Sequence, residues 1–262
     1  MVVLLKELKK GTKGFLIWTL AITFMLVVCI VIYPEMKGEM EGMSDIFSNM
    51  GAFSDAFGMD QLNFGTLIGY YGIECGNMLG MGGGFFAAII GIAMLSKEEK
   101  DHTAEFLLTH PVKRSSVVLQ KLMAVVVQLV VFNAFVTAMG FLSIKLVGES
   151  VPAKEFLLIH LGYFILQIEI ALICFGISAF LKRGGIAVGI GIAVFMYFAN
   201  LISNITEKTE FLKYVTPFAY ADPSSIVKDK SLDMTLVLLG MGCAVVAVIA
   251  GFIKYTKKDI SS

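Results

Sequence analysis

Six long apolar stretches, nearly free of charged side chains, constrain the fold more than any other feature of this sequence. A bilayer core about 30 Å thick is crossed by about 20 residues of α-helix, and each stretch reaches that length. The short alternating strands that build membrane barrels are absent from the sequence. We therefore predict an all-α integral membrane protein with six transmembrane helices, at residues 14–33, 70–96, 117–145, 156–181, 184–204 and 232–254.

The composition excludes a soluble fold. Hydrophobic residues make up 57% of the 262 residues and charged residues only 16%, against roughly 25% charged residues in an average soluble domain. A soluble domain of this length leaves roughly a quarter of its chain surface in water, which so apolar a chain cannot cover with polar groups. The formal net charge is zero, so we expect membrane lipid as the surroundings and no nucleic-acid partner.

Lysine and arginine are divided unequally between the two ends of the predicted helices. Fourteen of the 21 basic residues fall on the side that carries both termini, and the positive-inside rule assigns that side to the cytoplasm. We expect a multi-pass protein of a prokaryotic plasma membrane. The fourteen residues are Lys6, Lys9, Lys10, Lys13, Lys97, Lys100, Lys113, Arg114, Lys121, Lys182, Arg183, Lys254, Lys257 and Lys258.

The segments between the spans have distinct expected roles within a single transmembrane domain. Residues 1–13 mix leucines with four lysines, which is typical of an amphipathic elbow helix on the inner membrane surface. In residues 34–68, methionine and phenylalanine recur at steps of three or four. That pattern predicts an extracellular amphipathic helix, which either leans on the membrane or contacts a substrate or partner. Residues 97–113 form a cytoplasmic loop, and residues 205–231 an extracellular one.

One face of the second span carries a small residue at every fourth position. Residues four apart lie on the same face of a helix, and small side chains there let another backbone approach closely. This stripe is either an intramolecular packing seam or a surface that slides during a conformational cycle. It consists of Gly72, Gly76, Gly80 and Gly84, followed by Ala88.

The fourth span carries polar side chains on two faces. At 100° per residue, Glu169 lies opposite a polar arc of about 60°. An acid at mid-membrane costs about 2.5–3.5 kcal/mol, so we expect both faces to be covered, one of them by a second copy of the chain. Glu169 is either a proton relay or a hydrogen-bonded acid that holds helices together. The arc consists of His160, Tyr163, Gln167, Cys174 and Ser178.

No motif of a soluble enzyme occurs in the sequence. It lacks a phosphate-binding loop, H-E-x-x-H and G-x-S-x-G, and its three histidines are scattered. The four cysteines show no C-x-x-C spacing and are expected to be small apolar packing residues. We expect no enzyme activity, no metal and no cofactor in this chain, so any ATP would bind to another chain.

Two segments carry the motifs of a known family. The run E-E-K-D-H-T-A-E-F-L-L-T-H-P-V-K-R at residues 98–114 resembles the E-x-x-x-G-T-x-E-x-L-L-S-x-P-x-[ST]-R element of ABC-2 type transporter permeases. It departs from that element at His102, where Gly is usual, and at Lys113, where Ser or Thr is usual. The run P-F-A-Y-A-D-P at residues 217–223 is similar to the P-F-x-Y-x-D-P element between the last two helices. With six spans, the resemblance covers the whole chain.

The resemblance implies the permease subunit of an ABC exporter. It would pair with a second permease, as a homodimer or heterodimer, and with two copies of a separate ATP-binding subunit that holds ATP and Mg. The cargo would be hydrophobic or amphipathic, such as a drug, a lipid or a peptide. The implied coupling helix carries Glu98, Glu99, Thr103, Glu105, Phe106, Leu107, Leu108, Pro111 and Arg114, and the implied extracellular gate carries Phe211, Tyr214, Pro217, Phe218, Tyr220, Asp222 and Pro223.

Under this interpretation, the translocation path or its helix interfaces involve the glycine stripe together with His160, Tyr163, Gln167 and Glu169. The alternative hypothesis is a carrier or channel that acts alone and is proton-coupled through Glu169. A sensor that binds a peptide without moving it is a third hypothesis.

Overall fold

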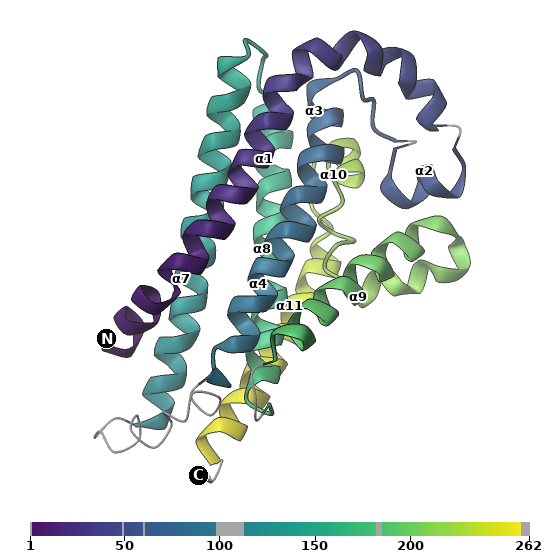
Figure 1. Cartoon of the computed structure of the whole chain (residues 1–262). Helices are drawn as coiled ribbons and strands as arrows, with labels where there is room; N and C mark the ends of the chain where they lie inside the picture. Colours follow the sequence, from purple (N-terminus) through teal and green to yellow (C-terminus); the bar gives the residue numbers. More distant parts are fainter. Residues whose placement is uncertain (1, 49, 60, 98–112, 182–184, 258–262) are drawn as a thin grey trace.

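The computed structural model describes residues 2–48, 50–59, 61–97, 113–181 and 185–257. Within these residues every regular element is a helix, which confirms the all-α prediction (Figure 1). The α-helices are α1 (Val2–Ser48), α2 (Ala52–Phe57), α3 (Leu67–Tyr70), α4 (Gly83–Ala93), α7 (Arg114–Leu146), α8 (Ala153–Ser178), α9 (Ile186–Ile205), α10 (Pro223–Asp229) and α11 (Met234–Lys257). Two π-helical turns, Tyr71–Cys75 and Met78–Gly82, and one 3₁₀ helix, Glu207–Tyr214, complete the set.

Six helical segments in the described chain are long and apolar enough to cross a membrane, as the sequence predicts. They are Val2–Met40, Leu67–Ala93, Arg114–Leu146, Ala153–Ser178, Ile186–Ile205 and Met234–Lys257. Each overlaps one predicted span. The second is one continuous rod made of α3, the two π turns and α4, because the π turns widen the helix without ending it.

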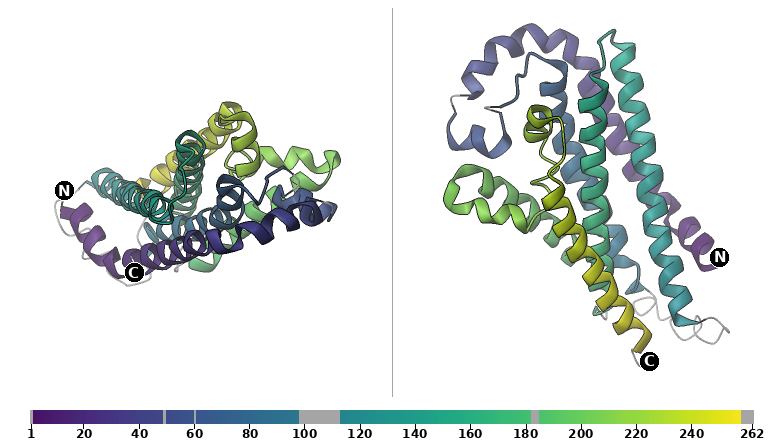
Figure 2. Two further views of the ribbon diagram at one scale, coloured as in Figure 1. Left: turned by 90° about the horizontal axis from the view of Figure 1, so that it is seen from above. Right: turned by 180° about the vertical axis from the view of Figure 1, so that it is seen from behind.

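Helix α8 lies at the centre of the bundle. It packs against α4, α7 and α11, while α1 runs along α7. Helix α9 contacts α4 at one end and leans away from the bundle, so that its other end meets α2 (Figure 2). Both termini lie at the same end of the molecule (Figure 1).

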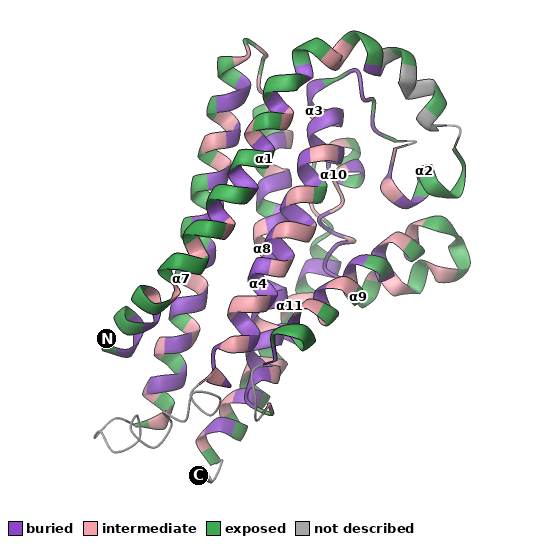
Figure 3. Cartoon of the chain, viewed as in Figure 1, coloured by how far each residue is buried: buried purple, intermediate pink, exposed green. Residues whose placement is uncertain are grey.

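Burial follows this arrangement (Figure 3). The second span and α8 are the most enclosed, whereas α1 and α11 turn more of their residues outward. The outward side chains are large and apolar, for example Phe24, Leu238 and Val246. Such surfaces are stable only against lipid, since burying them from water is what drives a soluble core together.

The first helix differs from the expected division of the N-terminal region. The sequence interpretation separates an elbow at 1–13, a span at 14–33 and an extracellular segment from 34 onward. The structure joins most of this in one helix, Val2–Ser48, with Pro34 inside it. The helix bends near its start and arches over the bundle at its far end (Figure 1). Gly51, at φ 59°, then leads into the short α2.

Candidate functional site

The glycine stripe of the second span lies against the aromatic ring of a residue on α8. A Cβ atom at Gly76 would lie 2.8 Å from the Tyr163 hydroxyl, and one at Gly80 would lie 2.9 Å from the Tyr163 ring. Real Cβ atoms do not come this close, so a larger residue at either position would require the Tyr163 side chain to move.

The same stripe also faces the segment that joins α9 to α10. A Cβ at Gly72 would lie 2.8 Å from the Pro223 side chain, and one at Gly84 would lie 3.6 Å from the Phe218 ring, an ordinary contact. These neighbours belong to the same chain. In this conformation the stripe is therefore an intramolecular seam, the first of its two sequence interpretations.

The two π turns fall within the stripe and were not foreseen from the sequence. A π turn holds more residues than an α turn, so residues four apart drift less around the axis and stay on one face. The Leu79 carbonyl, in the second π turn, accepts a hydrogen bond of 3.1 Å from Gln167 Nε2. Asn133 Nδ2 donates to Gln167 Oε1 at 2.8 Å. Gln167 thus ties α8 to both neighbouring spans.

The polar arc of α8 is paired within the bundle. His160 Nε2 lies 2.6 Å from the Tyr71 hydroxyl, and its Nδ1 lies 2.9 Å from the Thr137 hydroxyl. The imidazole is almost fully buried, at 4% exposed. Buried polar groups are stable only when hydrogen-bonded, and both ring nitrogens have a partner here.

Glu169 lies on the opposite face of α8 and is buried by the chain itself. Its Oε2 accepts a hydrogen bond of 2.8 Å from the Tyr220 hydroxyl. The carboxylate rests on Gly240 of α11, where any Cβ would overlap it. Residues of the same chain, on α11 and at Tyr220, therefore cover this face of α8, so Glu169 needs no second copy of the chain to bury it.

The predicted gate residues divide into a buried group, an exposed group and a half-buried pair, Asp222 and Pro223. Pro217, Phe218 and Tyr220 are buried, with Tyr220 only 2% exposed. Phe211 and Tyr214, on the 3₁₀ helix, are 63% and 57% exposed. The structure does not bring these two groups together. We call residues 217–223 the wedge, because this segment enters between the second span, α8 and α9.

Local hydrogen bonds explain the shape of the wedge. The Thr216 hydroxyl donates to the Met196 carbonyl of α9 at 2.7 Å and accepts from the Phe218 amide at 3.2 Å, which turns the chain inward. At the other end, Asp222 Oδ1 accepts from the Ser224 amide at 3.2 Å. Asp222 is thus the N-cap of α10 and Pro223 its first residue, an arrangement that starts a helix abruptly.

A polar cavity of about 420 Å³ lies beside the wedge, between the 3₁₀ helix, α10 and the start of α11. Glu210, Lys213, Asp222 and Asp233 are among its lining residues. Lys213 donates to Glu210 at 2.5 Å, and this hydrogen bond raises the pKa of Lys213. Tyr220 also lines the cavity, so its ring links this space to the buried Glu169.

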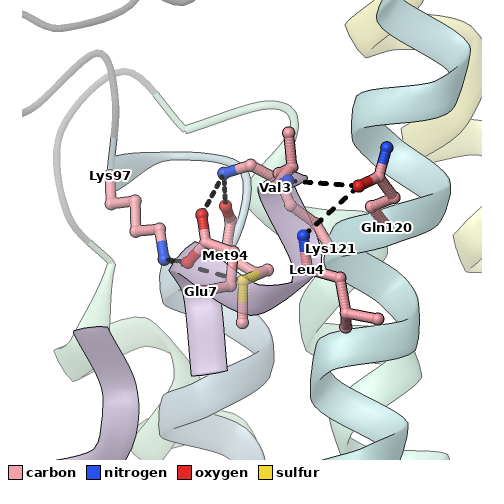
Figure 4. A network of polar contacts seen from close by, with 7 residues as sticks. All are labelled: Val3, Leu4, Glu7, Met94, Lys97, Gln120 and Lys121. Carbon is pink, nitrogen blue, oxygen red and sulfur yellow. Dashed lines mark hydrogen bonds and ion pairs between the residues drawn. The ribbon is translucent and has the colours of Figure 1, made fainter. Parts of the chain in front are cut away.

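At the end of the bundle that carries the termini, charged side chains join three helices (Figure 4). The Glu7 carboxylate of α1 forms ion pairs with Lys97, at the end of the second span, and with Lys121 of α7, at 3.5 Å from Lys121 Nζ. Lys121 is fully buried, and its Nζ donates to the Met94 carbonyl at 2.6 Å. Lys121 therefore caps the Met94 carbonyl at the C-terminal end of the second span, where a cation is favoured. We call Glu7, Lys97 and Lys121 the ion clamp.

Gln120 strengthens this joint. Its Oε1 accepts hydrogen bonds from the Val3 and Leu4 amides at 3.1 and 3.3 Å, so it satisfies amides in the first turn of α1, where a helix has no partners of its own (Figure 4). Sequence analysis did not single out Glu7, Gln120 or Lys121. The available signal was that Glu7 is the one acid among the basic residues at 1–13.

The coupling residues predicted from the sequence lie outside the described residues, except for Arg114. Arg114 is the first residue of α7 and is partly exposed. The residues outside the described chain are Glu98, Glu99, Thr103, Glu105, Phe106, Leu107, Leu108 and Pro111. The ion clamp joins the two helices that flank this segment.

Comparison with protein families decides the classification. The family model described as ABC-2 family transporter protein matches residues 1–260, almost the whole chain. This chain belongs to the ABC-2 transporter family. A comparison with curated proteins gives no match. The six membrane-length helices and the family together make it a multi-pass membrane component of an ABC-type transporter, a permease. The family generally works with an ATP-binding subunit.

Proposed function

We propose that this chain is the permease subunit of an ATP-driven exporter. Two permease copies, identical or different, and two copies of a separate ATP-binding subunit would form the complex, with both termini in the cytoplasm of a prokaryotic cell. ATP and Mg would bind only to the partner. The cargo would be hydrophobic or amphipathic, such as a drug, a lipid or a peptide.

The observation that carries this proposal is the continuity of the second span. One end of this helical rod contacts the ion clamp and leads directly into residues 98–112, the proposed coupling segment. The other end carries the glycine stripe, on which Tyr163 and the wedge rest. A movement of the ATP-binding subunits could thus reach the extracellular gate along a single rigid element, as a switch between two packed states.

The seam between stripe and wedge suits such a switch. Its contacts are van der Waals packing of aromatic rings and proline on glycine, with few ionic groups to desolvate when they separate. Six membrane-length helices, together with apolar and aromatic side chains along this seam, favour an apolar or amphipathic cargo.

The complex itself provides the test. The full-length chain is purified from its native membranes with its ATP-binding subunit and reconstituted in vesicles, and transport of candidate drugs, lipids and peptides is measured with and without ATP. The proposal expects transport that requires ATP and depends on the partner's hydrolysis. Transport that proceeds without any ATP-binding chain would refute it.

A proton-coupled carrier using Glu169 remains the second candidate function. The supporting observation is that Tyr220 both lines the polar cavity and donates to Glu169. Glu169→Gln separates the two hypotheses, because glutamine still accepts the Tyr220 hydrogen bond but carries no exchangeable acid proton. The exporter retains ATP-driven transport in this variant, whereas the carrier loses transport driven by a pH gradient.

A further inference from the structure

A groove of about 660 Å³ lies between α7 and α8, which run side by side (Figure 2). Two residues that line it, Leu157 and Leu161, are 57% and 46% exposed, so the groove opens outward. At 1.5 Å per residue, the lining residues of α7 lie about 8–24 Å from Leu146, the end of α7 farthest from the termini. Since α7 is a membrane-length helix, the groove faces the hydrocarbon core of the bilayer.

The lining of this groove is mostly apolar. Phe141, Phe156 and Phe164 contribute aromatic rings, and no Asp, Glu, Lys or Arg of the described chain lines it. A charged group would leave water here without an ionic partner, which is costly. The volume falls within the range of about 300–1,000 Å³ that is usual for sites of drug-sized molecules. The groove therefore suits a neutral and largely apolar occupant.

The described lining also contains three polar side chains, two of which are bonded to each other. The Thr137 hydroxyl lies 2.9 Å from His160 Nδ1. The third, Asn133, donates through Nδ2 to the Leu129 carbonyl at 2.9 Å and to Gln167 Oε1 at 2.8 Å. Both of these hydrogen bonds use its nitrogen. Its Oδ1 accepts no hydrogen bond from the described chain.

The free Asn133 oxygen points to a ligand that donates a hydrogen bond. Asn133 is only 7% exposed, but its Oδ1 keeps some accessible surface, and the residue lines the groove. An amide oxygen that leaves water without finding a donor is costly. The acyl chains of ordinary phospholipids have no donor, so they would fill the groove and leave this oxygen unsatisfied. A hydroxyl group on an apolar molecule supplies the donor.

We propose that this groove binds a neutral, lipid-soluble molecule that carries a hydroxyl group and reaches the site from the bilayer. Its hydroxyl donates to Asn133 Oδ1, and its apolar body packs on Phe141, Phe156 and Phe164. The site does not depend on the proposed export function, because binding from the bilayer requires neither ATP nor a partner chain.

Two photoreactive probes test the site. One is a long-chain secondary alcohol with a diazirine in its alkyl chain, and the other is the methyl ether of the same alcohol, which has no donor. The full-length protein in phosphatidylcholine vesicles is labelled with each probe at equal membrane concentration, and the labelled residues are identified by mass spectrometry. We expect the alcohol to label the groove about three- to fivefold more than the ether, the factor of one hydrogen bond in a membrane. The exposed Phe24 of α1 should be labelled equally by both.

Three variants test the residues. Asn133→Leu removes the acceptor, so the alcohol should lose its advantage over the ether. Because Asn133 also binds Gln167, a second variant leaves it in place: Ala134→Phe puts a ring into the groove from an exposed lining position and should lower labelling by both probes. Val131→Phe is the control, since Val131 is 48% exposed on the same helix outside the lining, and it should retain the labelling.

Equal labelling of the groove by the alcohol and the ether in the unaltered protein would overturn the proposal, because it would show that ordinary lipid chains fill the groove. Exclusion of both probes would also overturn it and would indicate a second copy of the chain seated on this face. A preference for the alcohol that persists in Asn133→Leu would rule out the Asn133 oxygen as the acceptor. Undiminished labelling in Ala134→Phe would show that the alcohol binds elsewhere.

Discussion

The two ends of the bundle differ in the chemistry that holds their helices together. At the end with the termini, the ion clamp joins α1, the second span and α7 through charges, one of which is fully buried. At the other end, the wedge packs on the glycine stripe, and the adjoining Thr216 hydroxyl donates a hydrogen bond to the Met196 carbonyl of α9. Separating buried charges is costly, whereas apolar contacts can part and re-form within a bilayer at lower cost.

This difference suggests a division of roles. We infer that the clamped end moves as one body, while the wedge and stripe change their contacts. The predictions below test that comparison, and they begin with the largest expected effect.

Removing the acid of the ion clamp should have the largest effect on stability. Glu7→Gln leaves the buried Lys121 without its ionic partner, which costs about 3 kcal/mol or more in the free energy of unfolding. Unfolding in detergent measures this loss. The double variant Glu7→Gln, Lys121→Met removes both charges and should recover most of the stability.

The matched control is Glu149→Gln, which breaks the partly exposed ion pair of Glu149 with Lys37, 3.1 Å long. Such pairs contribute at most about 1 kcal/mol. If the two single variants lose equal stability, the clamp is an ordinary surface ion pair and the comparison fails.

A larger side chain in the glycine stripe should have the next largest effect. Gly80→Leu pushes a side chain into the Tyr163 ring, and overpacking of this kind costs about 1–3 kcal/mol. We expect transport to fall more than insertion into the membrane. Gly191→Leu, on α9, is the control, because a Cβ at Gly191 meets no atom within 4 Å. Equal transport by the two variants would argue that the stripe does not take part in the cycle.

The hydrogen bond to Glu169 should contribute a similar amount to stability. Tyr220→Phe removes the hydroxyl that donates to the buried carboxylate, at a cost of about 1–3 kcal/mol. Tyr214→Phe changes a hydroxyl on an exposed ring and should have no measurable effect. Unfolding of the two variants under identical conditions provides the comparison, and equal stability would show that the Tyr220–Glu169 bond does not hold the wedge.

The smallest expected effect concerns the end of the wedge. Asp222→Ala removes the N-cap of α10 and should cost about 1 kcal/mol, whereas Asp222→Asn keeps an oxygen acceptor and should retain most of the stability. Equal loss in both variants would indicate that the charge of Asp222, and not its cap, is what the wedge requires.

The spans could be predicted because hydropathy and length act locally along the chain. The ion clamp could not be predicted, since Glu7 and Lys97 are 90 residues apart and only the fold brings them together. The π turns were missed because glycines four apart are also the pattern of one face of an ordinary α-helix. The continuity of α1 was missed because Pro34 and the glycines near the start of α1 usually indicate that a helix ends. A long membrane helix tolerates such residues in its interior.

The neighbours of Glu169 could not be predicted for a similar reason. Helical phase correctly placed Glu169 opposite the polar arc, but phase does not identify the neighbour. Gly240 of α11 leaves space for the Glu169 carboxylate, and Tyr220 of the wedge donates a hydrogen bond to it. The Asp222-Pro223 pair was recognised only as part of the family element, although an N-cap followed by proline is also a local signal for the start of a helix.

The most direct test of the central claim, that a partner ATPase drives this permease, is ATP hydrolysis by the purified complex with a charge reversal in the coupling segment. We expect Glu105→Lys to insert normally but to lose the ATP-binding subunit or its cargo-stimulated hydrolysis, whereas Lys208→Glu, in the segment between the last two spans, retains both. Normal assembly and stimulated hydrolysis in Glu105→Lys would contradict the claim.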